Sequence, residues 1–411
     1  MGPSAMNQIL LTADRLWDGT GKAILQRPLL RIVDEKIDRV ESALLPPATC
    51  TGERTDFPGC TILPGFIDTH VHLVMGALDT SAAIIEQITR DSEAALLARI
   101  EDNAGKALRV GLTTVRDCGG TKTHVQQVRD RIRRGEIVGP DVIACGSPIT
   151  TTLGHCHWLG LVADSYEEVE RAAYRMLAEN ADFLKVMATG GNMTPTSNPM
   201  TAQYDARTLG RITEIGRAAN KHAAAHVLSQ AALPAAVAAN YRTIEHCDWR
   251  VEEWRYEFDP ELARRMIDQN QFAGLTMSGF TRRAFDSYVR GLDLPPIKRL
   301  DARFACERQM IDFGVRYTLH TDAGVTLCPI ERFAVGMRAA EVELKLTPSE
   351  VLRACTSSAA EAICLPDRGV LQAGKRADLV VVEGDPTRDL ACMEKIRAVM
   401  KAGVWYHRVP V

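Results

Sequence analysis

The chain has 411 residues, of which 46% are hydrophobic and 25% charged, a composition that fits a folded protein with a large core and excludes a disordered one. Its formal net charge of -3 gives no electrostatic reason to expect a nucleic acid or an anionic membrane as partner. We find no stretch of roughly 18 apolar residues and no basic segment leading into an apolar one at the N-terminus, so neither a membrane span nor a secretory signal is indicated. We therefore expect a cytoplasmic protein with a small-molecule partner.

The eleven cysteines are scattered along the chain and form no C-x-x-C pair. This spacing fits reduced thiols that are buried as small apolar groups better than a disulfide framework or a zinc knuckle. It therefore agrees with the expected cytoplasmic location.

Both ends of the chain are predicted to be rich in β-structure. From about residue 7 to 56, short apolar runs alternate with Gly and Pro, and no long helical period is present. The same pattern returns at 369–385 and 396–408. Because chain termini often lie close together, we expect residues 6–60 and 365–411 to form one small β-sandwich domain.

The central part, residues 61–364, alternates short apolar segments with amphipathic ones such as 92–110 and 205–221. Strands that alternate with helices are typical of parallel sheets, and eight such units predict an α/β fold of the (β/α)8 TIM barrel type. The eight predicted strands are 61–71, 111–119, 141–149, 182–190, 221–227, 242–247, 272–279 and 315–322.

Two histidines end the first predicted barrel strand. Alternate side chains of a strand point to the same face, so His70 and His72 share a face with Asp68, and their backbones lie roughly 7 Å apart. Two imidazoles placed in this way can bind one metal ion, although a histidine on a strand is more often a satisfied core or edge residue. Asp68 is expected to accept a hydrogen bond from one of these histidines, or otherwise to serve only as a cap.

Further ligand-type side chains end other predicted strands. His226 ends the fifth strand, His246 the sixth and Asp322 the eighth. In a barrel of this type the carboxyl ends of the strands form the mouth and carry the active site. Imidazoles and a carboxylate at one mouth form a ligand set that suits zinc or a neighbouring transition metal.

Lys185 lies inside the apolar fourth strand. A buried lysine is costly unless it is paired, neutral or chemically changed. One interpretation is that its stem is buried while the ammonium group reaches the rim of the barrel. The interpretation that we favour is a carbamate, formed with carbon dioxide, whose two oxygens would bridge two metal ions.

These residues, together with "PGFIDTHVH" (64–72) and "GVLQAGKRADLVVVEGDP" (369–386), resemble the amidohydrolase superfamily over nearly the whole chain. The resemblance implies two divalent metal ions, most commonly zinc, and a metal-bridging hydroxide that attacks the substrate. It also implies that Asp322 acts as the general base that takes the proton of the bridging water. The implied metal ligands are His70, His72 and Asp322 for one ion, His226 and His246 for the other, and carboxylated Lys185 between them.

Two further stretches narrow the resemblance to the imidazolonepropionase-like and Xaa-Pro dipeptidase-like group. These stretches are "MATGG" (187–191) after the lysine and "GHCHWLG" (154–160) after the third strand. In this group a loop histidine is expected near the substrate carbonyl, and His155 and His157 are the candidate catalytic residues, with His155 preferred. The same loop could instead merely pack around Trp158.

The sequence also bears on the reaction. Ser229 stands where deaminase-type members carry a glutamate, three residues after His226, and phosphotriesterase-like members generally lack the flanking sandwich. We therefore predict hydrolysis of an amide-type carbon–nitrogen bond in a small molecule, a dipeptide or an N-acyl amino acid. The alternatives are hydrolysis of esters, lactones, phosphotriesters, cyclic amides or carbamates at the same site, and a non-catalytic scaffold.

Substrate contacts are less clearly marked. The polar loop 190–204 is a predicted lid or wall of the pocket. Arg282, Arg283 and Arg290 follow the seventh strand and could bind a substrate carboxylate, although three such arginines also fit a solvated helix face. Because exposed barrel helices commonly form contacts between copies, we expect a homo-oligomer.

Overall fold

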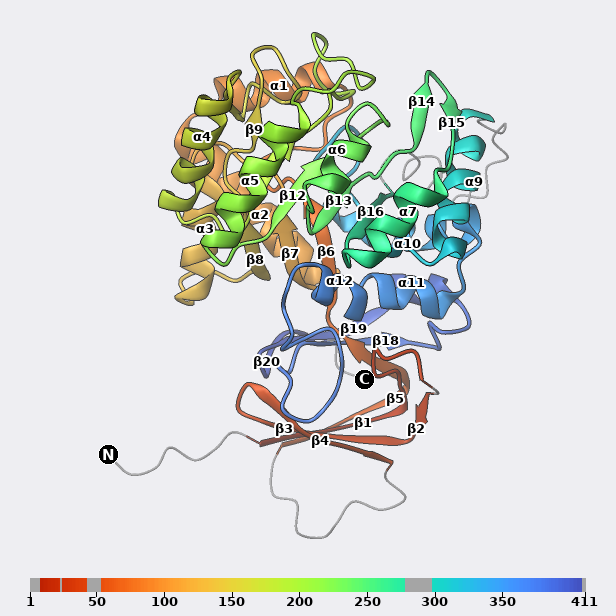
Figure 1. Cartoon of the computed structure of the whole chain (residues 1–411). Helices are drawn as coiled ribbons and strands as arrows, with labels where there is room; N and C mark the ends of the chain where they lie inside the picture. Colours follow the sequence, from red (N-terminus) through yellow and green to blue (C-terminus); the bar gives the residue numbers. More distant parts are fainter. Residues whose placement is uncertain (1–7, 23, 43–52, 278–297, 409–411) are drawn as a thin grey trace.

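A computed structural model describes residues 8–22, 24–42, 53–277 and 298–408 of the chain. A region of mixed helices and strands lies next to a region made mainly of strands (Figure 1). No helix of the described residues is long and apolar enough to cross a membrane.

The strand-rich region is one sheet built from both ends of the chain. Its strands follow the order β20-β19-β18-β5-β1-β3-β4, and β2 pairs with β1. Both chain ends thus contribute to one sheet, while its division into the two layers of a sandwich stays a prediction. The bounds are β1 Gln8–Leu16, β2 Leu25–Gln26, β3 Pro28–Val33, β4 Lys36–Ser42, β5 Glu53–Pro64, β18 Leu379–Glu383, β19 Ile396–Lys401 and β20 Val404–Arg408.

This sheet has a hydrophobic core of its own. Ile9, Leu11 and Ala13 alternate along β1, so they point to the same face of the strand. They are buried in one cluster with Leu30 of β3 and Val381 of β18. The N-terminal and C-terminal segments therefore stabilise each other by burying a shared apolar face.

The mixed region contains parallel strands in two hydrogen-bonded groups, ordered β6-β7-β8 and β10-β9-β11-β12-β13-β16-β17. Each predicted barrel strand contains an observed strand. The third is divided into β8 and β9, and the first four residues of the first belong to β5 of the other sheet. The bounds are β6 Phe66–Val71, β7 Leu112–Asp117, β8 Asp141–Ala144, β9 Ile149–Thr150, β10 Leu161–Val162, β11 Leu184–Met187, β12 Ala223–His226, β13 Thr243–Glu245, β16 Phe272–Thr276 and β17 Arg316–His320. A separate hairpin joins β14 Arg250–Glu252 to β15 Arg255–Tyr256.

Backbone hydrogen bonds connect the two groups of strands. The amide of Asp322 donates to the carbonyl of His70 at 2.9 Å, and the amide of His72 donates to the carbonyl of Ala323 at 2.8 Å. At the other edge, the amide of Asp182 donates to the carbonyl of Ala144 at 2.8 Å. The region is thus an α/β arrangement of parallel strands, and the regular (β/α)8 barrel stays a prediction.

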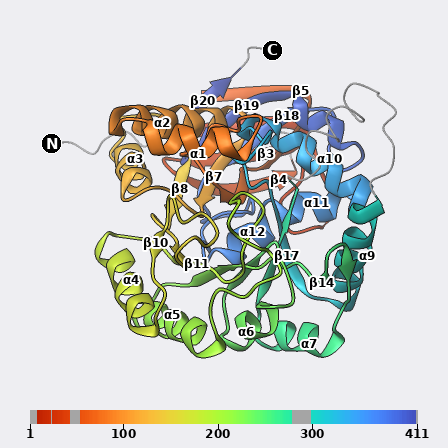
Figure 2. The same cartoon turned by 90° about the horizontal axis from the view of Figure 1, so that it is seen from above.

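Helices surround these strands, and α2 to α7 follow one another around the outside in the view from above (Figure 2). The helix α2 shows why the sequence folds in this way. Its buried residues Leu96, Ile100, Ala104 and Leu108 are spaced by four and form one apolar stripe, and the Ser92 side chain caps its first turn. The helices are α1 Ser81–Arg90, α2 Glu93–Arg109, α3 His124–Arg133, α4 Tyr166–Ala178, α5 Ala206–Ala218, α6 Leu233–Ala238, α7 Pro260–Asp268, α9 Lys298–Phe313, α10 Phe333–Leu344, α11 Pro348–Ala354 and α12 Ser357–Ala362, with short 3-10 turns η3 Ile330–Arg332 and η4 Leu390–Glu394.

Charged side chains connect the two regions at the amino-terminal ends of the parallel strands. Asp141, the first residue of β8, forms ion pairs with Arg376, with Arg368 at 2.7 Å and with Lys401 at 3.6 Å. Arg376 also pairs with Asp378 at 3.1 Å. We call these five residues the junction cluster.

Candidate metal centre

One cavity is lined by all six side chains that the sequence predicted as metal ligands. These residues belong to β6, β11 and β12 or lie one or two residues after β6, β13 and β17, so most of them stand at the carboxyl ends of the parallel strands. Active sites of barrel enzymes lie at these strand ends. The six residues are His70, His72, Lys185, His226, His246 and Asp322.

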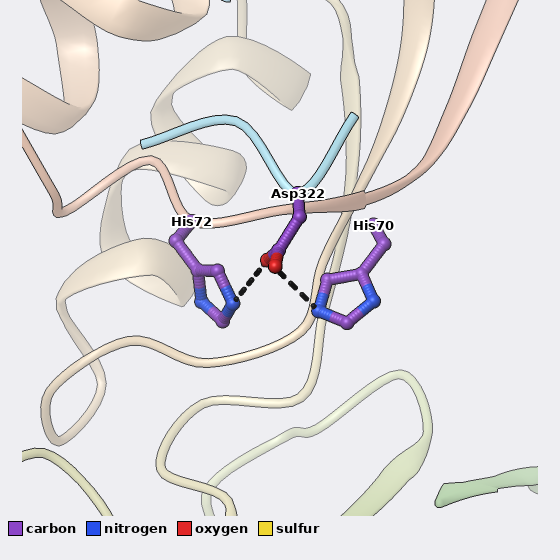
Figure 3. A group of neighbouring side chains, drawn as sticks. All are labelled: His70, His72 and Asp322. Atoms are coloured by element: carbon purple, nitrogen blue, oxygen red, sulfur yellow. Dashed lines mark ion pairs between the residues drawn. The ribbon is translucent and has the colours of Figure 1, made fainter. Parts of the chain in front are cut away.

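Three of these side chains meet around one point (Figure 3). The Nε2 atom of His70 lies 3.4 Å, and that of His72 3.2 Å, from Oδ1 of Asp322. The ligand atoms of the three residues are close enough to share one ion. Asp322 has a φ of 56°, in the left-handed region that non-glycine residues rarely adopt, and backbone strain of this kind is common at functional sites.

The second ring nitrogen of each first-strand histidine is already held. His70 Nδ1 lies 3.1 Å from Glu245 Oε2, and His72 Nδ1 lies 2.9 Å from the carbonyl oxygen of Gly119. An acceptor at Nδ1 keeps the proton on that nitrogen and leaves the lone pair on Nε2. Both Nε2 atoms are therefore available as metal ligands and face the same carboxylate.

Asp68 does not orient a histidine ring, contrary to the prediction. Its carboxylate accepts hydrogen bonds from the backbone amides of His70 and Thr321, at 3.1 Å and 3.2 Å, and from the Thr321 hydroxyl. Strand alternation placed Asp68 on the correct face, but the turn after β17 supplies its partners. Asp68 thus connects the ends of β6 and β17.

His226 and His246 lie together on the other side of the cavity, with ring centroids 4.6 Å apart. His226 Nε2 is 3.3 Å from the carbonyl oxygen of Gly190, and His246 Nδ1 is 2.6 Å from the Thr276 hydroxyl. One nitrogen of each ring is thus engaged, which leaves the other for a metal ion. These two residues fit a second metal-binding position.

Lys185 is fully buried, and its Nζ atom has no hydrogen-bond partner among the residues that the structure describes. Burying an ammonium group without a partner is so costly that such a lysine normally loses its charge or is modified. A lysine carbamate between two groups of imidazole ligands would remove this cost. The residues present therefore fit a two-metal centre bridged by Lys185.

Burial also sets the charge of three of the four candidate ligand histidines, whereas for His72 the effect of burial is outweighed by the neighbouring Asp322, which raises the pKa. It lowers the pKa of His70 and His246 well below the usual value, and neighbouring cationic groups add to this effect. The pKa of His226 is lowered well below the usual value by burial and by His155. Neutral imidazole is the form that binds a metal, so the cavity keeps these rings in the required state.

The sequence prediction missed two residues that support the site. Glu245 accepts a hydrogen bond from Arg116 Nη2 at 2.6 Å while it also contacts His70. Burial raises the pKa of Glu245, but the positive charge of Arg116 and other neighbours outweighs burial and lowers the pKa to about 2. The available signal was a charged residue inside an apolar strand, the same signal that identified Lys185.

A second group with metal-ligand geometry consists of His70, Cys118 and Glu245. Burial raises the pKa of the Cys118 thiol to about 12, whereas a metal binds the thiolate. Glu245 is occupied by Arg116. This group therefore supports His70 and is a poor metal site itself.

The two candidate catalytic histidines of the loop after the third predicted strand differ in their position relative to the cavity. His155 lines the cavity and stacks on His226 with ring centroids 4.4 Å apart, and its Nδ1 has no hydrogen-bond partner among the described residues. Burial lowers the pKa of His155 to about 3. His157 is instead turned toward the carbonyl oxygen of Gly154, which its Nδ1 contacts at 3.0 Å. A catalytic role for either residue stays a prediction.

The wall of the cavity includes parts of the loop 190–204, as the sequence predicted. Asn192 and Met193 of this loop face the cavity, and Arg303 of α9 lines it as well. The arginines proposed as carboxylate ligands, Arg282, Arg283 and Arg290, lie outside the described residues.

The sequence matches the family described as "Amidohydrolase family" over residues 61–406. Ochratoxinase of Aspergillus niger is 27% identical over 369 residues, which cover 82% of this chain and 73% of that protein. Its crystal structure superposes with a TM-score of 0.84 at 24% identity and covers 99% of this chain and 97% of that one. An imidazolonepropionase of Fusobacterium nucleatum subsp. nucleatum is 24% identical over 372 residues, 82% of this chain and 79% of that protein. A crystal structure of a Xaa-Pro dipeptidase with methionine bound in its active site has a TM-score of 0.83 at 22% identity, and covers 98% of this chain and 100% of that one.

Proposed function

Because this chain belongs to the amidohydrolase family and is a hydrolase of carbon–nitrogen bonds, we propose that it cleaves a dipeptide or an N-acyl amino acid with the help of two divalent metal ions, zinc being our first choice. The proposed fold is a (β/α)8 barrel, residues 61–364, with a β-sandwich domain formed by 6–60 and 365–411. The proposed location is the cytoplasm.

Lys185 carries the proposal. Its Nζ atom is buried without a hydrogen-bond partner among the described residues, in a cavity with five histidines and a carboxylate. A non-catalytic scaffold would have no reason to bear the cost of an unpaired buried lysine at this place. A carbamate formed with carbon dioxide would turn the same lysine into a metal ligand.

Two side chains of the protein would take part in the proposed reaction beside the metal ions. Metal ions at the site, when bound, supply a Lewis acid for the substrate carbonyl and lower the pKa of water. Asp322 would accept the proton that the hydrolytic water loses and would return it to the leaving nitrogen. His155, neutral and with a free Nδ1, would act on the substrate carbonyl oxygen as that oxygen gains charge.

The relatives and the cavity wall favour an amino acid as one half of the substrate. The Xaa-Pro dipeptidase structure contains methionine in its active site. In this chain the side chains of Met187, Met193, Leu228 and Val325 give the cavity an apolar wall that an amino-acid side chain would contact. A cyclic amide is the second candidate, because an imidazolone ring is itself a cyclic amide and an imidazolonepropionase is among the relatives.

Metal analysis and a substrate screen test the proposal. The chain is loaded with zinc or cobalt, with and without bicarbonate, and its metal content is measured by inductively coupled plasma spectrometry. The loaded protein is then assayed on dipeptides, including Xaa-Pro, and on N-acyl amino acids. Matched esters, lactones, phosphotriesters, carbamates and cyclic amides serve as controls.

We expect about two metal ions per chain, a metal content that depends on bicarbonate, and the highest kcat/KM on a dipeptide or N-acyl amino acid. Well under one metal ion per chain after loading would contradict the metal centre. A higher kcat/KM on an ester or phosphotriester than on the isosteric amide would contradict the proposed substrate.

A further inference from the structure

Arg303 brings an incompletely paired guanidinium to the wall of the metal-centre cavity. It lies in the second turn of α9 and is the one arginine among the described lining residues. Its side chain is 12% exposed, and its Nη2 atom is buried without a hydrogen-bond partner in the described part of the chain. Buried donors are normally paired, so an unpaired one on a side chain that lines a cavity suggests a partner that arrives with the ligand.

The other edge of the same guanidinium is fixed. Its Nε donates to Glu307 Oε1 at 2.8 Å, one helical turn further along α9, and Glu307 is itself 3% exposed. Burial lowers the pKa of Arg303, but the charges of Glu307 and Asp248 outweigh burial and raise it. The guanidinium is therefore charged and held in one orientation by α9.

We propose that Arg303 binds the carboxylate of the substrate through the edge of its guanidinium that Glu307 leaves unpaired, while the metal centre faces the scissile amide. The inference rests on the proposed function, since it assigns one end of that substrate to a residue. A guanidinium carries five N–H groups in a planar fork; Glu307 takes the donor at Nε, and Nη2 retains its own. A carboxylate supplies the missing acceptor, whereas a neutral substrate leaves the buried donor unpaired.

The other lining residues agree with an anionic ligand. Asp322 is the one carboxylate of the described lining, and it is engaged with His70 and His72. Apolar side chains such as Met193 and Leu228 line the same cavity. The substrate class is thus an N-acyl amino acid or dipeptide with a free carboxylate and an apolar side chain, and Arg303 selects the carboxylate.

A purely structural role for Arg303 would consist of neutralising Glu307 and Asp248. In that case the loss of Arg303 would weaken the binding of charged and neutral ligands equally. A carboxylate ligand and its amide, which share every other group, therefore separate the two roles.

The experiment is calorimetric titration of the zinc-loaded protein with N-methanesulfonyl-methionine and with its carboxamide, both of which resist hydrolysis. We expect the wild-type protein to bind the carboxylate about 10- to 100-fold more tightly than the amide. The Arg303→Met variant should lose this preference while its affinity for the amide stays within about threefold. Circular dichroism and metal content verify the fold and the metal centre of each variant.

Arg250→Met is the matched control, because Arg250 is another buried arginine whose charge acts on Asp248, and it is not part of the described cavity lining. This variant should keep the preference for the carboxylate. If Arg303→Met leaves Glu307 unpaired and the protein unfolds, Arg303→Lys retains the charge but not the planar fork and should reduce the preference by about tenfold.

Three results would overturn the assignment: no carboxylate preference in the wild-type protein, an unchanged preference in the Arg303 variants, or an equal loss of affinity for both ligands. The experiment measures ligand binding and not hydrolysis, so the role of Arg303 and the proposed function can be contradicted independently of each other. A protein that binds the carboxylate through Arg303 but cleaves no amide would contradict only the proposed function. Amide cleavage without a carboxylate preference would contradict only the role of Arg303.

Discussion

The two ends of the parallel strands both bury charged side chains, but they pair them differently. At the amino-terminal ends, each member of the junction cluster takes part in at least one ion pair, and the cluster connects the strand-rich region to the α/β region. At the carboxyl ends, Lys185 Nζ and His155 Nδ1 have no hydrogen-bond partner among the described residues, and Arg303 is paired only in part, through its Nε. Arg376 Nε and Asp378 Oδ2 of the junction cluster also form no hydrogen bond in the described part of the chain, but both residues remain ion-paired.

This difference in pairing suggests that the amino-terminal ends of the strands serve stability and the carboxyl ends serve function. Paired buried charges are costly to break, because the removal of one leaves its partners unpaired in the interior. Unpaired groups around a cavity carry a cost in stability and acquire a role when a ligand completes them. We therefore expect substitutions at the amino-terminal ends to change stability, and substitutions at the carboxyl ends to change metal content and activity.

The largest expected effect comes from replacing the buried lysine at the carboxyl ends of the strands, with the same replacement at the amino-terminal ends as the comparison. Lys185→Met should lose its bound metal and lower kcat/KM by about 1000-fold, because several kcal/mol of transition-state stabilisation depend on the metal centre. The metal-free variant should unfold at the same or a higher urea concentration than metal-free wild-type protein, since a buried amino group without a hydrogen-bond partner among the described residues is removed.

Lys401→Met is the control for this replacement. Lys401 is a buried lysine of β19, and its Nζ donates to the carbonyl oxygen of Gly139 at 2.6 Å. This variant should keep its metal content and lose about 1–3 kcal/mol of stability. Retention of wild-type metal content by Lys185→Met would show that the lysine does not bridge the metals.

The second prediction concerns the centre of the junction cluster. Asp141→Ala removes the acid that faces Arg368, Arg376 and Lys401, and should lower the free energy of unfolding by about 3 kcal/mol. Urea unfolding monitored by circular dichroism measures this loss. Metal content and kcat/KM at low urea should stay near the wild-type values, and a loss of metal would mean that the two ends of the strands are coupled.

The third prediction tests whether paired charges also support the carboxyl-end site. Glu245→Gln keeps the shape of the side chain but removes the negative charge beside His70 and Arg116. Outer-shell changes of this kind lower metal affinity by about 10- to 100-fold. Zinc titration against a competing chelator checks this, and an unchanged affinity would limit Glu245 to a structural role.

The smallest expected effect is a dependence on acid pH. Burial raises the pKa of Asp141, but Arg376 and Arg368 outweigh burial and lower it to about 2, against a usual value of 3.8. Because the pKa is lower in the folded state, this stabilisation is present above about pH 4 and is lost as the pH falls toward 2. Between pH 5 and pH 3 the metal-free wild-type protein should lose about 1 kcal/mol more than Asp141→Asn in urea unfolding. Equal losses in the two proteins would show that Asp141 is not the titrating group.

Several features of the site could be predicted from the sequence because they depend on local periodicity. Strand alternation placed His70 and His72 on one face, and a lysine in an apolar strand marked Lys185 as exceptional. The structure brings these residues into one cavity with His226 and the other predicted ligands. The assignment of Asp68 was wrong, because alternation gives the face of a side chain and not its hydrogen-bond partner.

Other features could not be predicted in this way. Arg116 and Glu245 are separated by 129 positions, and their contact depends on how β7 and β13 face each other. Arg303 belongs to a helix, where an arginine on a solvated face is the ordinary expectation, and only the packing of α9 turns it toward the cavity. The third predicted strand is divided into β8 and β9, and Gly146 and Pro148 at the break are a turn signal that the prediction passed over.

The sequence by itself determined where strands and helices alternate and which side chains stand at the strand ends, because these follow from backbone geometry over a few neighbouring residues. The tertiary structure decided which groups are paired. It connects Asp141 to the arginines of the junction cluster, and within the described part of the chain it leaves one nitrogen of Lys185 and one of Arg303 without a hydrogen-bond partner. Pairing depends on residues far apart in the chain that packing brings within a few ångströms of one another, and local periodicity contains no information about that distance.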